Sequence, residues 1–269
     1  MPQTNLLNRE LSETTISSSA LKKADASRSS TGGVKARDRV AQHGEVFTPD
    51  WVVSEMLDML PSGEHGDVWT AEEDKKQKTF LEPACGEGAF LMEILLRKLQ
   101  RTTERYSHDQ DQWEWQAILA VSSLYGIELL EDNSERCIMN LYELFLEQYY
   151  DRQFPSKNRD SLAAIKFIIS RNIMQGDFLT QKQRDGNPII VSDFTPIVTS
   201  DGSRMLQRKD YELSELVRKK SNEGTIFSLL TDDPGIVAEY KPVPWRLIES
   251  AEVISGEETH ESESGEAHA

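Results

Sequence analysis

Leu81-Glu82-Pro83-Ala84-Cys85-Gly86-Glu87-Gly88-Ala89-Phe90 joins a short apolar run to a strongly apolar helical pattern that continues to Leu99. Gly86 and Gly88 permit a tight turn and a close approach of the backbone to a ligand. The first N–H groups of a helix have no partner within that helix, so they are available to a bound group. The segment therefore predicts a strand, a ligand-binding turn and a helix.

Apolar residues on both sides of this segment alternate between helical and strand spacing. The pattern predicts helices over residues 50–60, 89–99, 113–123, 133–150 and 210–220. It predicts strands that end at 80–81 and that cover 124–129, 166–169 (extending to 173) and 189–191. Strands that alternate with helices are typical of the α/β class, and they predict a doubly wound, mainly parallel sheet.

Composition and charge divide the chain into three parts. Residues 1–40 are rich in Ser, Thr, Lys and Arg and carry little apolar surface, which predicts a disordered N-terminal arm. Residues 41–248 form the predicted α/β domain, and residues 249–269, with seven Glu and no Lys or Arg, are predicted to be a disordered acidic tail. The net charge is −16, and it is still −9 without that tail. DNA binding usually needs a basic surface. If DNA is the substrate, we therefore expect a partner subunit to supply many of the DNA contacts.

Two cysteines, Cys85 and Cys137, have no metal-ligand spacing, and we expect neither a disulfide framework nor a metal site. They are compatible with a reducing cytoplasm, the predicted location. No stretch approaches the ~18 uncharged apolar residues of a membrane helix. The polar N-terminus shows no secretion signal.

The segment around Gly86 resembles motif I of the adenine-specific (N6) DNA methyltransferases, whose usual form is Pro-Ala-Cys-Gly-x-Gly-x-Phe. Upstream, His43-Gly44-Glu45-Val46-Phe47-Thr48-Pro49 resembles motif X, which precedes motif I in the gamma-type members of that family. The resemblance implies a Rossmann-like S-adenosylmethionine-dependent methyltransferase sheet. It also implies that the cofactor, S-adenosylmethionine, contacts residues of both motifs: Phe47, Thr48, Pro49, Glu82, Pro83, Ala84, Gly86, Gly88 and Phe90.

Two further segments fit the same family. Glu128 ends the second predicted strand, where an acidic residue can accept both ribose hydroxyls of an adenosyl group, and Leu129 follows it. Gly176-Asp177-Phe178 resembles the third cofactor motif, in which the Asp bonds the adenine amino group and the apolar neighbour covers the ring. The resemblance spans roughly residues 40–195.

The family's acceptor element, an Asn/Asp/Ser-Pro-Pro-aromatic tetrapeptide after the fourth strand, does not occur in the sequence. Ser192-Asp193-Phe194-Thr195-Pro196 stands where it is expected. Asp193 and Phe194 are one candidate, as a diverged catalytic pair that accepts from the amino group and stacks on a flipped base. The alternative is that the chain binds cofactor but has lost its acceptor site, or needs another subunit to complete it.

These motifs leave several functions open. The leading hypothesis is an adenine-N6 DNA methyltransferase subunit of a modification or restriction–modification system, active or degenerate, with DNA and a protein partner. A second is a non-catalytic pseudo-methyltransferase that acts in regulation or assembly. Methylation of a protein or small molecule suits the acidic surface, but related protein-glutamine methyltransferases also rely on an Asn-Pro-Pro-Tyr-type motif. Motif X argues against a nicotinamide-binding dehydrogenase, because it has no role in that class of enzyme.

Overall fold

The computed structural model describes residues 48–62, 67–70, 72–220 and 236–254. Phe47, the predicted disordered arm 1–40 and most of the predicted acidic tail (residues 255–269) lie outside the described residues. Contacts divide the chain into two units, Met1–Asp50 and Trp51–Ala269, and the fold below is that of the second.

Three parallel strands form the sheet that carries the Gly86 turn, Glu128 and Gly176. They are β1 (Phe80–Glu82), β2 (Leu124–Glu128) and β3 (Ile173–Gln175), in the order β1-β2-β3. Glu82 lies opposite Gly126, and Glu128 lies opposite Gln175, so the three carboxyl ends meet at one edge of the sheet. Among the described strands, the order does not reverse beside β1. The reversal that defines a doubly wound sheet is therefore not found there.

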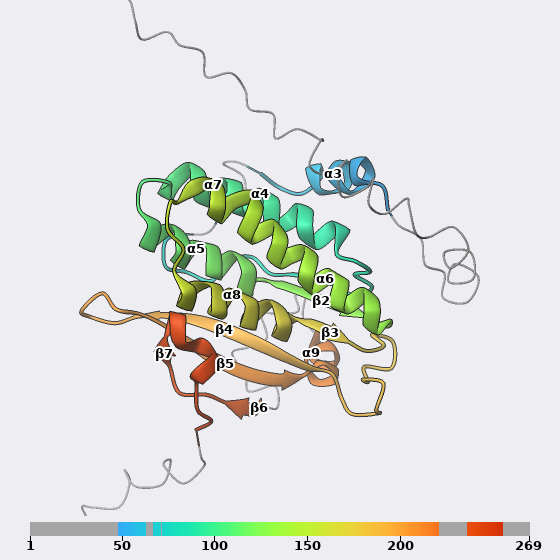
Figure 1. Ribbon diagram of the computed structural model, residues 1–269. Coiled ribbons are helices and arrows are strands. Elements are labelled where there is room, and N and C mark those ends of the chain that lie inside the picture. The colour runs from blue at the N-terminus through green and yellow to red at the C-terminus, as the bar shows by residue number, and fades with distance from the viewer. Residues whose placement is uncertain (1–47, 63–66, 71, 221–235, 255–269) are drawn as a thin grey trace, which may run out of the picture. The chain divides into compact units, whose positions relative to one another are not determined.

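Helices cover one face of this sheet, as Figure 1 shows. They are α4 (Ala89–Tyr106), α5 (Gln110–Ser122), α6 (Glu131–Glu143) and α8 (Arg159–Asn172). Leu124 of β2 and Ile173 of β3 belong to the same buried apolar cluster as residues from all four helices. Asp109 and Asn158 fix the starts of α5 and α8, because their side chains accept hydrogen bonds from the first free N–H groups.

The segment between α6 and α8 contains a π-helix and a short α-helix. The π-helix η1 (Leu144–Tyr150) continues α6 and leads into α7 (Asp151–Gln153), while α3 (Asp50–Asp58) precedes β1. Trp113 of α5 packs edge-on against Phe154, which follows α7, with ring centroids 5.3 Å apart. Aromatic packing therefore anchors the end of this long helical segment to α5.

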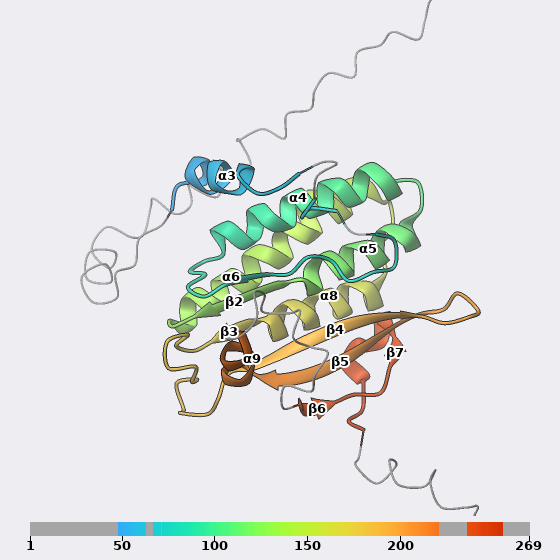
Figure 2. The same cartoon turned by 180° about the vertical axis from the view of Figure 1, so that it is seen from behind.

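A second, antiparallel sheet covers part of the opposite face. It contains β4 (Ile190–Val198), β5 (Arg204–Glu212), β6 (Ile236–Glu239) and β7 (Val243–Pro244), and α9 (Leu213–Lys220) follows β5 (Figures 1 and 2). Tyr125 and Ile127 of β2 point away from the helices, because side chains alternate along a strand. They form a buried cluster with Ile189, Val191 and Tyr211.

Four sequence predictions are corrected here. Residues 166–169 are not a strand but part of α8, whose Ala164, Ile165, Ile168 and Ile169 form one buried helical face. The strand predicted at 189–191 runs on to Val198, and it pairs antiparallel with β5 instead of joining the parallel sheet. The helix predicted from residue 210 begins at Leu213.

The fourth correction concerns the predicted tail. Residues 249–254 are part of the folded structure. The 3-10 helix η2 (Trp245–Ser250) includes residues 249 and 250, and the Ile254 N–H donates to the Glu239 carbonyl at 2.7 Å.

The structure confirms the helices predicted at 50–60, 89–99, 113–123 and 133–150 and the strand predicted at 124–129, with shifts at their ends. Within the part of the chain that the structure describes, no helix combines the length and the apolar character needed to cross a membrane.

Candidate cofactor site at the carboxyl edge of the parallel sheet

The turn after β1 depends on two glycines with positive φ angles. Gly86 has φ 54° and Gly88 has φ 94°, and the Gly88 N–H donates to the Cys85 carbonyl at 2.8 Å. A Cβ at Gly88 would lie 2.7 Å from Cys137 Sγ, so the close approach of this turn to α6 requires glycine at this position. A Cβ at Gly86 would meet nothing within 4 Å. The backbone at Gly86 therefore faces open space, as a ligand-binding turn requires.

Glu128 joins this turn to the ends of the other two strands. Its Oε2 accepts from the Gly86 N–H at 2.8 Å, and its Oε1 accepts from the Leu130 N–H at 3.0 Å. Its carbonyl accepts from the Gly176 N–H at 2.8 Å. The side chain is only 7% exposed. The carboxylate predicted to bind ribose is thus also the acceptor that fixes the motif I turn.

Helix α6 holds the same turn from its other side. Asn140 Nδ2 donates to the Glu87 carbonyl at 2.8 Å, and Asn133 Nδ2 lies 3.5 Å from Glu128 Oε1. Cys137, between them on α6, contacts Cys85, and this contact and burial raise the pKa of the Cys85 thiol. Sequence analysis did not find Asn133 and Asn140. Their spacing from Cys137, four and three residues, places all three on one face of α6, which was the available signal.

Asp177 and Phe178 follow β3 at the same edge. The Asp177 carboxylate accepts from the Leu179 N–H at 2.8 Å and from Thr180 Oγ1 at 3.1 Å, so it orders its own turn. Phe178 is half-buried and packs on the apolar cluster beneath the sheet. Leu179, which sequence analysis did not select, is 90% exposed beside them.

The remaining residues of motif I, together with Leu129, lie around this edge in different surroundings. Glu82 is half-buried, and burial raises the pKa of its carboxyl group, although a hydrogen bond from the Ala84 backbone opposes the shift. Pro83 and Ala84 are exposed, and Leu129 is 52% exposed. Phe90 instead packs on the helical core. The edge thus presents carboxylates next to open apolar surface.

The two motif X residues that are described, Thr48 and Pro49, precede α3 without regular structure. They belong to the unit Met1–Asp50, and their role toward the cofactor stays a prediction. The site described here consists only of residues from the second unit.

Asp193 and Phe194 do not lie at this edge. Both are inside β4, where they had been expected to follow a strand, because the strand extends to Val198. Asp193 forms an ion pair with Lys76, which lies four residues before β1 and thus toward the amino end of that strand. Phe194 is 1% exposed and belongs to the helical core. Neither side chain is presented to the Gly86 turn.

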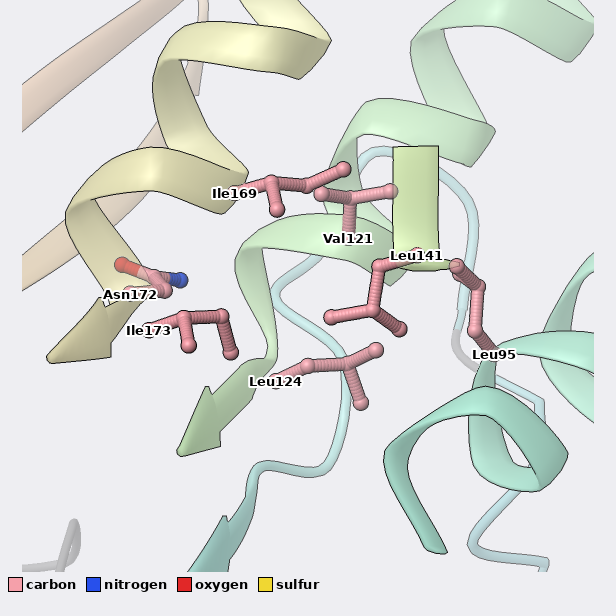
Figure 3. A pocket seen from close by; sticks show the side chains of 7 residues that line it. All are labelled: Leu95, Val121, Leu124, Leu141, Ile169, Asn172 and Ile173. Carbon is pink, nitrogen blue, oxygen red and sulfur yellow. The ribbon is translucent and has the colours of Figure 1, made fainter. Parts of the chain in front are cut away.

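A small cavity lies elsewhere, in the helical core (Figure 3). Its volume of about 10 Å³ gives room for about one water molecule. Six of its seven lining side chains are apolar, and the seventh is Asn172, whose Oδ1 accepts from no described residue. The cavity is too small for an adenosyl group.

The sequence was also compared with those of known proteins. The sequence model of the family N-6 DNA Methylase matches residues 34–180, more than half of the 269 residues. The matched range includes the Gly86 turn, Glu128 and Asp177. No curated protein and no solved structure matches the chain. The chain therefore belongs to the N-6 DNA Methylase family.

Proposed function

We propose that the carboxyl edge of the parallel sheet binds S-adenosylmethionine. The observation that carries this proposal is the meeting of three motif segments at Glu128, which contacts the Gly86 turn and Gly176 and ends β2. When bound, the cofactor supplies a methyl group on a sulfonium centre. The residues of the chain bind and orient it.

Each contact has a physical basis in the described geometry. Glu128 Oε2 accepts one backbone N–H, from Gly86, and a carboxylate oxygen has a second lone pair that a ribose hydroxyl can use. The open space beside Gly86 admits the ligand close to the backbone. Asp177 offers a carboxylate to an adenine amino group, with Phe178 and Leu129 as apolar cover. Burial raises the pKa of the Glu82 carboxyl group. A cationic group of the bound cofactor beside Glu82 would lower that pKa, so binding would favour the ionised carboxylate.

We infer that the protein serves as a cofactor-binding methyltransferase subunit in a DNA modification or restriction–modification system. Its family has DNA as substrate, but its net charge of −16 opposes the binding of phosphates. A partner subunit would provide the DNA contacts. The absence of a Pro-Pro-aromatic element from the sequence favours an acceptor site that is completed by that partner.

The placement of Asp193 and Phe194 favours a second function, that of a non-catalytic pseudo-methyltransferase. Asp193 is 3% exposed and paired with Lys76, and Phe194 is buried among core residues. A base that stacked on Phe194 would displace this packing. In this case the cofactor acts as a ligand that stabilises the subunit within an assembly.

Calorimetric titration of the full chain with S-adenosylmethionine tests the binding proposal. Transfer of a labelled methyl group to adenine-containing duplex DNA, measured with and without co-purified proteins, separates the two functions. We expect binding in the titration and transfer only with a partner. No measurable binding by the folded chain would disprove the proposed site, while binding without transfer under any condition would identify the pseudo-methyltransferase.

A further inference from the structure

Residues 177–188 form most of the connection between β3 and β4 (Figure 1), and we call them the Leu179 loop. Backbone contacts within the loop order it. The Asp177 N–H donates to the Lys182 carbonyl at 2.9 Å, and Lys182 forms an antiparallel bridge with Pro188. The loop therefore presents its exposed side chains from a defined backbone.

The exposed side chains of the loop include two cations and one large apolar group. Leu179 is almost fully exposed, and within the loop, which the structure describes throughout, it is the only exposed large apolar side chain. Lys182 and Arg184 are exposed as well. Arg184 lies 3.5 Å from Glu131, but both side chains are exposed, and ion pairs of this kind contribute little energy. The Arg184 guanidinium can thus bind another anion at low cost.

The acidic residues that flank these side chains form hydrogen bonds within the loop itself. The run from Phe178 to Arg184 contains no Asp or Glu, in a chain with 46 acidic and 30 basic residues. Asp177 precedes the run, and its carboxylate accepts from the Leu179 N–H at 2.8 Å. Asp185 follows the run, and its carboxylate accepts from the backbone and the side chain of Asn187. The two cations and Leu179 thus have no acidic side chain between them.

The loop borders the candidate cofactor site. Immediately before the loop begins, the Gly176 N–H donates to the Glu128 carbonyl at 2.8 Å. At the end of β3, Gln175 Nε2 donates to the Leu129 carbonyl at 2.9 Å. A methyl acceptor has to reach a cofactor bound at this carboxyl edge, so its path to the cofactor runs next to the loop.

We propose that the Leu179 loop contacts the DNA substrate beside the cofactor site, with Lys182 and Arg184 at phosphates and Leu179 against the bases, an inference that rests on the proposed function. Lys and Arg side chains bind phosphates, and several DNA-binding proteins insert an apolar side chain such as leucine between bases. Because the loop is ordered before binding, little ordering entropy opposes the contact. The net charge of −16 leaves most of the DNA affinity to a partner subunit.

The composition of the loop favours DNA over a protein as the molecule that it contacts. The centre of a protein–protein interface is apolar and depleted in lysine. The loop offers Leu179 alone as an exposed large apolar group, with Lys182 and Arg184 close to it in sequence. The family to which the chain belongs has DNA as substrate, which matches two cations next to the site.

Charge reversal tests the phosphate contacts on the full chain. The probe is a fluorescein-labelled duplex that contains adenine, and the readout is anisotropy at low ionic strength. Lys182→Glu/Arg184→Glu should bind about tenfold more weakly than wild type, and the slope of log K against log salt should fall in magnitude by about 2. Arg159→Glu/Lys166→Glu, at exposed positions of α8, changes the net charge equally and should keep the slope. Equal losses in the two double variants, or no binding by wild type, would overturn the proposal.

Leu179→Ser tests the contact with bases. A short duplex with 2-aminopurine at its adenine positions reports unstacking as a rise in fluorescence. We expect saturating wild-type protein to raise the fluorescence and Leu179→Ser to abolish the rise, with the salt slope unchanged. Leu247→Ser, at an exposed leucine of η2, is the matched control and should behave as wild type. An equal rise in Leu179→Ser would contradict the contact. Loss of a co-purified protein from Leu179→Ser, with the rise retained, would identify a protein-binding surface instead.

Calorimetry with S-adenosylmethionine separates failure of this inference from failure of the proposed function. All the loop variants should bind the cofactor as wild type does. If wild type binds the cofactor but the loop variants bind DNA normally, the inference fails and the proposed function stands. If wild type does not bind the cofactor, the proposed function fails, and the DNA measurements decide the loop contact by themselves. Weaker cofactor binding by Leu179→Ser would place Leu179 in the cofactor site and overturn its assignment to DNA.

Discussion

Glu128 Oε2 accepts a 2.8 Å hydrogen bond from the Gly86 N–H, across 42 positions of sequence. The same carboxylate accepts from the Leu130 N–H, and the Glu128 carbonyl accepts from Gly176. One residue therefore links the turn after β1 to the ends of β2 and β3. A change at this residue should affect folding and ligand binding together.

Glu128→Ala removes the acceptor of two backbone N–H groups. We expect the free energy of unfolding to fall by about 1–3 kcal/mol, the cost of leaving buried donors unpaired. S-adenosylmethionine binding should weaken on the order of 1–3 kcal/mol as well. Urea unfolding and calorimetry measure the two effects, and Glu131→Ala, at an exposed position of α6, is the matched control. Unchanged affinity in a folded Glu128→Ala protein would remove Glu128 from the site.

The two glycines of the turn should respond differently to alanine. Gly88→Ala should lower stability strongly, because its Cβ meets Cys137 Sγ at 2.7 Å and its φ is 94°. Gly86→Ala should cost only about 1 kcal/mol for its left-handed backbone, since its Cβ meets nothing within 4 Å. It should nevertheless weaken cofactor binding, because the methyl group enters the space assigned to the ligand. If Gly86→Ala binds the cofactor with wild-type affinity, the ligand does not approach this face.

The pair Lys76–Asp193 can be tested for a structural or a catalytic role. A double-mutant cycle with Lys76→Met and Asp193→Asn should give a coupling energy of about 1 kcal/mol in urea unfolding, with cofactor affinity unchanged. Both single variants should have the same effect on any methyl transfer seen with a partner. Loss of transfer in Asp193→Asn alone, with Lys76→Met active, would establish Asp193 as a catalytic acceptor.

Lys98 on α4 should make stability depend on pH. Its ammonium donates to Gln77 Oε1, the Lys78 carbonyl and Ser123 Oγ, at 2.8–3.1 Å, and burial lowers its pKa from 10.5 to about 7, although Asp67 opposes the shift. Between these values the folded protein holds fewer protons than the unfolded chain, so stability rises with pH. We expect a gain of about 2 kcal/mol from pH 7 to pH 9, relative to Lys98→Met. Parallel pH profiles for the two proteins would exclude this role.

Duplex DNA should bind the isolated chain weakly at physiological ionic strength and without useful specificity. The reason is the net charge of −16, which opposes phosphate contacts. Fluorescence anisotropy with labelled DNA measures the affinity, and a titration of salt shows whether cations of the protein replace counterions. Tight, sequence-selective binding by this chain alone would reveal a basic surface and contradict the need for a partner.

The sequence predicted the elements whose signals are local. The glycines of the motif I turn, the apolar helix after it and the short strand before Glu128 could each be located from their own residues. The Lys166–Ile169 run was misassigned because a short apolar run suits a strand or a buried helix equally well, and the cap at Asn158 decides for the helix. The extension of β4 through Asp193 depends on pairing with β5, a contact that no pattern within β4 reveals.

The candidate site, like the fold, was predicted only in part from the sequence. Glu128 could be chosen because it ends a strand, but its bond to Gly86 and the support from Asn140 are contacts between distant segments. The pairing of Asp193 with Lys76 is likewise absent from any spacing rule. Residue type and position therefore indicated the candidates, and only packing showed which of them meet.

The two roles of Glu128, in fixing the Gly86 turn and in the proposed cofactor contact, have a consequence for the evolution of such a sequence. Since Gly86 and Glu128 hold the strand ends together, selection for a folded subunit is enough to retain them, even in a lineage that no longer transfers methyl groups. An intact motif I therefore indicates that the subunit folds, and does not by itself indicate that the subunit transfers methyl groups.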